Sequence, residues 1–146
     1  MTSEKCNAIL SRMQRYCAMQ DRSVQQIREK LYGMEELTEQ EREYIIQRLL
    51  DDKFLDDARF VENYVRSKVN QKKWGRQKIR HGLYRHRIPD VMIDQGLEGI
   101  DIESYKANLL SLLTTRQNQR NDRNGLIRYL LQRGYEFEEI ENLLNQ

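Results

Sequence analysis

The sequence has few of the residues that interrupt helices or cross-link chains. Its 146 residues include one proline and two cysteines, and no apolar run approaches the length that spans a bilayer. If Cys6 and Cys17 share a helix, a rise of about 1.5 Å per residue separates them by about 16 Å, whereas a disulfide requires Cα atoms within about 7 Å. We therefore expect a cytoplasmic protein with reduced thiols, no signal peptide and no membrane contact.

Helical periodicity dominates what is present. Apolar residues recur at helical spacing, and no stretch alternates with the period of two that a half-buried strand shows. We predict an all-α fold, with the polar stretches 97–104 and 114–122 as exposed connections or frayed helix ends. The predicted helices cover residues 4–20, 23–33, 38–51, 57–72, 75–86, 89–97, 103–117, 123–134 and 137–145.

The helical pattern repeats along the chain. Shifts of 52 and then 48 residues align Ile27, Ile79 and Ile127; Arg28, Arg80 and Arg128; and Leu31, Leu83 and Leu131. Any amphipathic helix offers several registers, so chance is the alternative, but the matched arginine favours a true repeat. We predict three tandem three-helix repeats of helix-turn-helix type, at 1–50, 51–100 and 101–146. A unit of this size is marginally stable alone, so the repeats should pack on their neighbours in an elongated, curved array.

The net charge of +2 hides an uneven distribution. Residues 63–89 carry nine lysines or arginines and no acidic residue, a charge of +9, whereas the flanks 51–62 and 90–100 carry −3 each. Without interspersed acids, these helices should gain none of the usual i,i+4 ion pairs. We interpret the segment as a contact surface for a polyanion or an acidic protein. The alternative is a solvated face that the acidic flanks neutralise.

The basic side chains are expected to lie on two helices that meet at the turn 72–75, KKWG. Arg59, Arg66 and Lys73 recur every seven residues and would form one stripe that faces away from the core. The aromatic rings of Tyr64, Trp74 and Tyr84 can stack on bases, although packing within the protein is the competing interpretation. The candidate contact residues are Arg59, Arg66, Lys68, Lys72, Lys73, Trp74, Arg76, Lys78, Arg80, Arg85 and Arg87.

Groups that could support chemistry are sparse. Asp51, Asp52, Asp56 and Asp57 lie close together, but no glycine forms a cation-binding loop there, and capping of the next helix is the favoured interpretation. His81 and His86 are five residues apart, which does not place them on one helical face. No phosphate loop, activated nucleophile or paired-cysteine motif is present. We expect no enzymatic activity, cofactor, bound metal or small-molecule substrate.

Two segments resemble the RecX family of bacterial recombinase regulators. Residues 54–83, FLDDARFVENYVRSKVNQKKWGRQKIRHGL, are similar to the family's Phe-Leu-Asp-Asp, Arg-Phe, Tyr-Val-Arg and Gly-x-x-x-Ile-Arg-x-x-Leu pattern. Residues 128–140, RYLLQRGYEFEEI, resemble its C-terminal signature. The chain departs from the family at two places. Arg76 stands where proline commonly follows the glycine, and HRIP at 86–89 replaces a usual Lys-Gly-Ile.

The resemblance implies a cytoplasmic, non-enzymatic protein that binds the RecA recombinase and lies along the groove of the RecA–single-stranded DNA filament. There such proteins dampen ATP hydrolysis, strand exchange and RecA-promoted repressor cleavage. We expect a monomer whose basic residues make the filament contact, with weak direct binding to DNA in addition. Two other hypotheses stay open: a helix-turn-helix protein that binds duplex DNA without RecA, and a structural helical adaptor whose basic segment is solvated.

Overall fold

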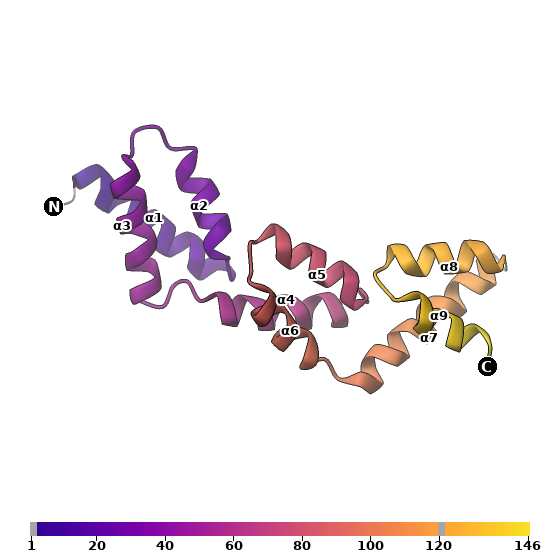
Figure 1. Cartoon of the computed structure of the whole chain (residues 1–146). Helices are drawn as coiled ribbons and strands as arrows, with labels where there is room; N and C mark the ends of the chain where they lie inside the picture. Colours follow the sequence, from indigo (N-terminus) through magenta and orange to yellow (C-terminus); the bar gives the residue numbers. More distant parts are fainter. Residues whose placement is uncertain (1–2, 120–121) are drawn as a thin grey trace. The chain divides into compact units, whose positions relative to one another are not determined.

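A computed structural model of the chain describes residues 3–119 and 122–146 (Figure 1). Within these ranges the secondary structure is helical, with no strand, and no helix is long and apolar enough to cross a membrane. The helices are α1 (Glu4–Met19), α2 (Val24–Tyr32), α3 (Glu39–Asp51), α4 (Asp57–Asn70), α5 (Arg76–Arg85), α6 (Asp90–Glu98), α7 (Ile102–Gln119), α8 (Arg123–Gln132) and α9 (Phe137–Leu144). The all-α prediction is confirmed.

Local capping explains why the helix boundaries lie close to the predicted ones. Capping boxes begin α2 and α3: the side chains of Ser23 and Thr38 accept from the N–H groups of Gln26 and Glu41, whose side chains accept from the caps in return. Of the two alternatives predicted for the polar stretch 114–122, the structure has the helix end rather than the connection over its first residues, because α7 continues as far as Gln119. Residues 120–121 lie outside the described part.

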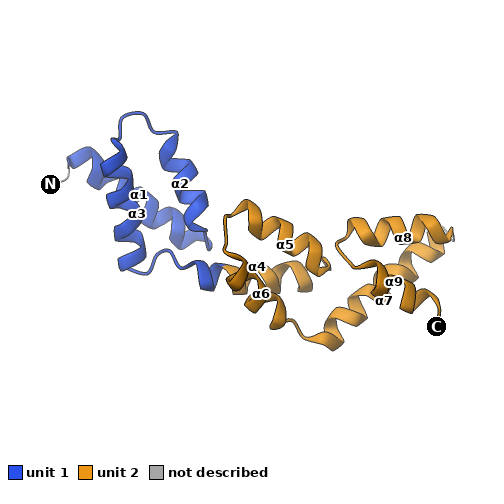
Figure 2. Ribbon diagram, in the orientation of Figure 1, with its two compact units in different colours: residues 1–60 blue, residues 61–146 orange. Residues whose placement is uncertain are grey.

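The chain divides into two compact units, residues 1–60 and 61–146 (Figure 2). In the first unit α3 packs against α1 and α2 around a core of aliphatic side chains. Cys6 and Cys17 both lie on α1, are buried and are free, and burial raises the pKa of each thiol. These cysteines therefore behave as small core residues rather than as reactive thiols.

The second unit contains α5 packed on α6, and α8 packed on α7 and α9. The approach of α4 to α6 is close, because a Cβ on Gly96 would lie 2.5 Å from Cγ1 of Val61. Two tyrosines, Tyr105 and Tyr135, are fully buried within the core of α7–α9, with ring centres 5.2 Å apart. Residues 61–100 of the second predicted repeat and the whole third repeat thus lie in one compact unit, whereas residues 51–60 belong to the other. The boundaries of the three repeats as separate domains stay a prediction.

The predicted repeat register is wrong for α8. Ile79 and Leu83 are fully buried on α5, but their proposed counterpart Leu131 is 44% exposed. The buried residues of α8 are Leu126 and Leu130, one position earlier. The match of Arg128 to Arg28 and Arg80 is lost with this one-residue change. Arg128 is an exposed side chain of α8.

Candidate polyanion-binding surface

The basic segment bends at the turn between α4 and α5. Asp56 caps the start of α4, since its Oδ1 accepts from the N–H of Arg59 at 3.1 Å, which confirms the capping role expected of this acidic stretch. The helix ends at Asn70, and the chain then turns through Lys73, whose φ of 54° is left-handed. The predicted helical stripe is therefore wrong for Lys73, which lies in the turn and not on α4.

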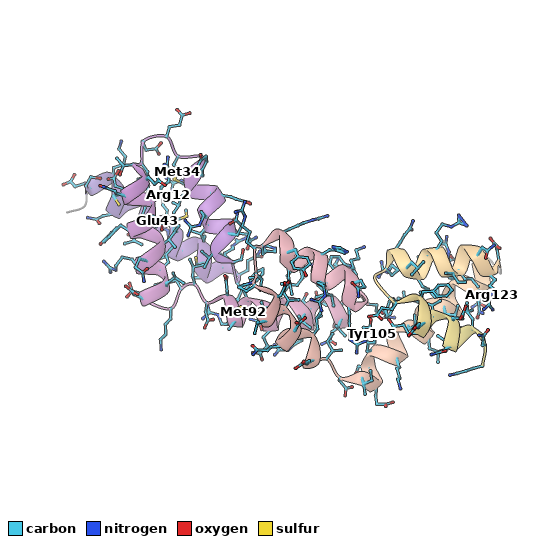
Figure 3. The ribbon with its side chains drawn as sticks, viewed as in Figure 1. Arg12, Met34, Glu43, Met92, Tyr105 and Arg123 are labelled. Atoms are coloured by element: carbon cyan, nitrogen blue, oxygen red, sulfur yellow. The ribbon has the colours of Figure 1, made fainter. Side chains whose placement is uncertain are left out.

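Hydrogen bonds attach this turn to the third predicted repeat, and we call the contact the repeat joint. The N–H of Gly75 donates to the carbonyl of Arg133 at 2.7 Å, and the hydroxyl of Tyr135 donates to the carbonyl of Lys73 at 2.7 Å. The N–H of Arg76 donates at 2.9 Å to the hydroxyl of Tyr105, a residue that is labelled in Figure 3. The cations around the turn therefore extend from a backbone that is held at several points.

Two residues of the joint explain features of the sequence. A Cβ on Gly75 would meet the backbone of Gly134, so glycine is required there by close approach, whereas its φ of −80° suits any residue. The departure from proline at Arg76 also has a structural reason, because proline has no N–H to donate to Tyr105.

Burial keeps the phenol groups of the two tyrosines in the joint protonated. Desolvation raises the pKa of both Tyr105 and Tyr135 well above the ordinary value for tyrosine. For Tyr105 the hydrogen bond from the N–H of Arg76 acts in the opposite direction and is the smaller effect. Both phenols stay protonated over the physiological range, so the two tyrosines add no charge to the joint.

Three cations of the segment have carboxylate partners. Arg80 binds Asp94 on α6 at 2.9 Å, and this hydrogen bond raises the pKa of the guanidinium. Arg76 lies 3.8 Å from Glu139 on α9. Arg66 binds Glu62 at 2.9 Å, so the expectation of no i,i+4 pairing is wrong at this position, because Glu62 lies just before the segment.

The other six cations form no ion pair with any described carboxylate, and we call them the carboxylate-free cations. They come from the end of α4, the turn, the length of α5 and the residues that follow it: Lys68, Lys72, Lys73, Lys78, Arg85 and Arg87. Among them, Lys73 donates to the hydroxyl of Ser111 at 3.1 Å. The positive charge of the segment is thus only partly neutralised within the protein.

The aromatic residues of the segment differ in their freedom to stack. The ring of Trp74 has the ammonium groups of Lys68 and Lys78 each 4.7 Å from its centre, so it makes cation–π contacts with both lysines. Tyr64 packs edge-on against His86 at 5.7 Å. Tyr84 is 45% exposed and is the most accessible of the three predicted stacking residues. Trp74 thus gathers two cations rather than offering an open face.

The side chain of Arg59 is engaged in contacts within the protein. Its guanidinium pairs with Asp21 at 3.3 Å and donates to the carbonyls of Lys53 and Phe54, each at 3.3 Å. These contacts lie within the unit 1–60 and connect the start of α4 to the residues after α3. Its role in an intermolecular contact stays a prediction, and the intramolecular bonds already engage its donors.

The remaining acidic and histidine residues form no metal-binding constellation in the described ranges. Asp57 accepts from the N–H of Val24 at 3.0 Å, which is a backbone contact. His81 lies beside the ring of Tyr84, with centres 6.5 Å apart. The arrangement of these residues supports electrostatic recognition, because several cations lie around a turn that the hydrogen bonds of the repeat joint hold in place.

Comparison with known proteins shows which family the chain resembles. Residues 56–97 match the family model described as "RecX, second three-helix domain". A regulatory protein RecX of Cronobacter sakazakii is 30% identical over 146 residues, covering 91% of this chain and 88% of the relative. One from Prosthecochloris aestuarii is 26% identical over 148 residues, covering 100% and 97%. One from Clostridium tetani is 31% identical over 112 residues, and the chain spans about half of its length, 51%.

Solved structures share the fold. A crystal structure of RecX from Lactobacillus salivarius superposes with a TM-score of 0.86 over 99% of this chain and 97% of the other, at 21% identity. A second regulatory protein RecX structure gives a TM-score of 0.81 over 98% and 73%, at 24% identity. The arrangement in three-helix units is therefore one that crystal structures of these proteins also contain.

Proposed function

Because this chain belongs to the RecX family of regulatory proteins, we propose that it regulates the RecA recombinase, mainly as an inhibitor. It binds RecA and the groove of the RecA–single-stranded DNA filament through residues 63–89. By occupying the filament it lowers ATP hydrolysis, strand exchange and RecA-promoted repressor cleavage, and so affects DNA repair and the SOS response. It acts by occupancy and carries out no reaction of its own.

One observation carries the proposal: six cations of this segment have no carboxylate partner among the described residues. Like charges that are not neutralised repel one another, which disfavours their concentration unless a negative partner compensates. A filament that carries single-stranded DNA provides such a partner. Each phosphate that a cation neutralises contributes about −0.7 to the slope of log K against log salt concentration.

ATP turnover by RecA filaments on single-stranded DNA tests the proposal. We expect stoichiometric protein to lower the turnover and the inhibition to weaken as salt rises. The double variant Lys72→Glu/Arg85→Glu reverses the charge of two carboxylate-free cations. If each contacts one phosphate, the slope of log K for filament binding against log salt concentration should become shallower by about 1.4. Unchanged turnover with the unsubstituted protein would contradict the proposal.

The matched control is Arg12→Glu/Arg15→Glu, which makes the same charge change on exposed positions of α1 (Figure 3). It should inhibit like the unsubstituted protein. Equal loss in both double variants would assign the effect to net charge rather than to the basic segment. A gel shift without RecA separates the remaining alternative, because sequence-selective binding to duplex DNA would favour a free-standing helix-turn-helix protein.

A further inference from the structure

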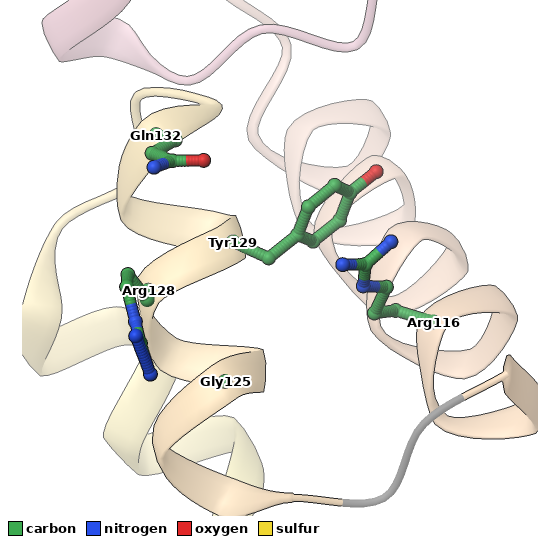
Figure 4. Close-up of a pocket in the computed structure, with 5 residues that line it drawn as sticks. All are labelled: Arg116, Gly125, Arg128, Tyr129 and Gln132. Carbon is green, nitrogen blue, oxygen red and sulfur yellow. The ribbon is translucent and has the colours of Figure 1, made fainter.

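A small polar cavity lies between α7 and α8 (Figure 4). Its volume is about 170 Å³, and the residues that line it are Arg116, Gly125, Arg128, Tyr129 and Gln132. Pockets that hold drug-sized ligands measure about 300–1,000 Å³, so this one is too small for a whole nucleotide. It has room for one small oxyanion or a few water molecules.

Arg116 brings an unsatisfied donor to this cavity. Figure 4 shows Tyr129 extending from α8 towards Arg116 on α7, and the guanidinium carbon lies 4.6 Å from the centre of the ring. The Nε of Arg116 is buried and has no hydrogen-bond partner in the described residues. Leaving a buried charged donor unpaired is costly, so this N–H requires an acceptor that the described residues do not supply.

The charge around the cavity is positive. Neither Arg116 nor Arg128 forms an ion pair with a described carboxylate. The nearest acidic residue in sequence, Asp122, accepts from the N–H of Gly125 at 3.2 Å as the N-cap of α8. Gln132 adds an amide that can donate to an oxygen. The described residues that line the cavity thus include two arginines and a glutamine, and none of them is a carboxylate.

We propose that this cavity is an oxyanion site that binds a single phosphate group. Guanidinium groups present planar donor pairs that match phosphate oxygens, and charge-assisted bonds of this kind are about twice as strong as neutral ones. The phosphate can come from free inorganic phosphate or from a phosphodiester of a DNA strand. The lining residues belong to the third predicted repeat and none of them lies in 63–89, so the proposal does not rest on the contact with RecA.

The test follows the Nε–Hε NMR signal of Arg116 in the full chain, identified by its loss in Arg116→Lys. Sodium phosphate is added in one arm and a short oligothymidylate in the other, both at constant ionic strength. We expect the Arg116 signal to shift and saturate with at least one of the two additives. The additive that causes the shift shows whether the site takes free phosphate or a DNA phosphodiester. Arg116→Lys should weaken the affinity by about tenfold or more, because lysine cannot reproduce the planar donor pair. That affinity is followed by the backbone amide signal of Tyr129.

Two controls keep the outcome specific. Arg133 also has a buried Nε without a partner, but its Nη2 already donates to the carbonyl of Lys72 in the repeat joint, so its signal should not move. Arg123→Lys makes the same substitution at an exposed position of α8 and should leave the affinity unchanged. No saturable shift of the Arg116 signal in either arm, or an equal shift of the Arg133 signal, would overturn the proposal.

Discussion

At the scale of single residues, Arg87 contributes a positive charge to the basic segment, but its left-handed backbone conformation lowers the stability of the fold. Arg87 has a φ of 55°, in the place where the family pattern has glycine, and Lys53 has a φ of 63° outside the basic segment. A non-glycine residue in this conformation costs about 1–2 kcal/mol, and glycine returns about 0.5–1 kcal/mol of this as chain entropy. Each of these residues is therefore tolerated in spite of its backbone conformation.

We predict that Arg87→Gly leaves the free energy of unfolding unchanged or raises it by up to about 1 kcal/mol. The same variant should bind RecA filaments more weakly, because it removes a carboxylate-free cation. Lys53→Gly is the matched control, with the same backbone conformation and the same loss of charge. Urea unfolding and filament titration measure the two effects. A clear loss of stability in Arg87→Gly would show that its side chain is part of the fold.

The buried phenol of Tyr135 predicts a loss of stability in alkaline solution. Its pKa is raised in the folded protein, mainly by burial, whereas an unfolded tyrosine ionises near pH 10. Above about pH 10 the unfolded state therefore binds fewer protons than the folded state, and stability falls as pH rises. Below this pH the contribution is fully present.

Denaturant unfolding between pH 8 and pH 11.5 measures this dependence. We expect Tyr135→Phe to be about 1 kcal/mol less stable at pH 8, through loss of its bond to Lys73, and to lose stability less steeply above pH 10. Tyr32→Phe, at a tyrosine that is 78% exposed, should behave like the unsubstituted protein. A profile for Tyr135→Phe that parallels the unsubstituted protein would contradict this interpretation.

At the scale of elements, the repeat joint depends on the contact of two glycine backbones. Gly75 is the N-cap of α5, and Gly134 follows α8 with a φ of 101°. The N–H of Gln77 donates to the carbonyl of Gly134 at 3.0 Å. No side chain fits between these two segments, so the turn of one repeat and the loop of the next share backbone hydrogen bonds directly.

We predict that Gly75→Ala destabilises the protein by about 3 kcal/mol or more, because its Cβ would overlap the backbone of Gly134. Gly99→Ala is the control. A Cβ there would meet its nearest neighbour, the carbonyl oxygen of Gly96, at an ordinary 3.5 Å, and the change should stay within about 1 kcal/mol. Thermal unfolding of the two variants measures the difference. Equal stability of the variants would show that the two segments can separate without cost.

At the scale of the whole molecule, the elongated and curved array of repeats stays a prediction. A compact protein of this length would have a radius of gyration of about 15 Å. An array in which each repeat packs only on its neighbours should exceed that value clearly. Small-angle X-ray scattering of the monomer measures it, and a radius near the compact value would contradict the array.

The sequence by itself determined the helices, the predicted family and the concentration of positive charge. Helix boundaries depend on local interactions, such as the capping box of Ser23 and Gln26, which a reader of the sequence can recognise. The ion pair of Arg66 with Glu62 is also local, at i,i+4, and was missed only because Glu62 lies just outside the basic segment. Interactions within one or two helical turns join residues that are close in the sequence, so the sequence alone can predict them.

Only the tertiary structure decided which cations are neutralised, which face of α8 is buried and why Gly75 is a glycine. Arg80 is paired by Asp94 on another helix, and Gly75 meets Gly134 from the next repeat. Leu130 rather than Leu131 is buried because of the position of α8 against α7 and α9. Each of these outcomes depends on where distant elements lie in space, and periodicity along one helix carries no information about that.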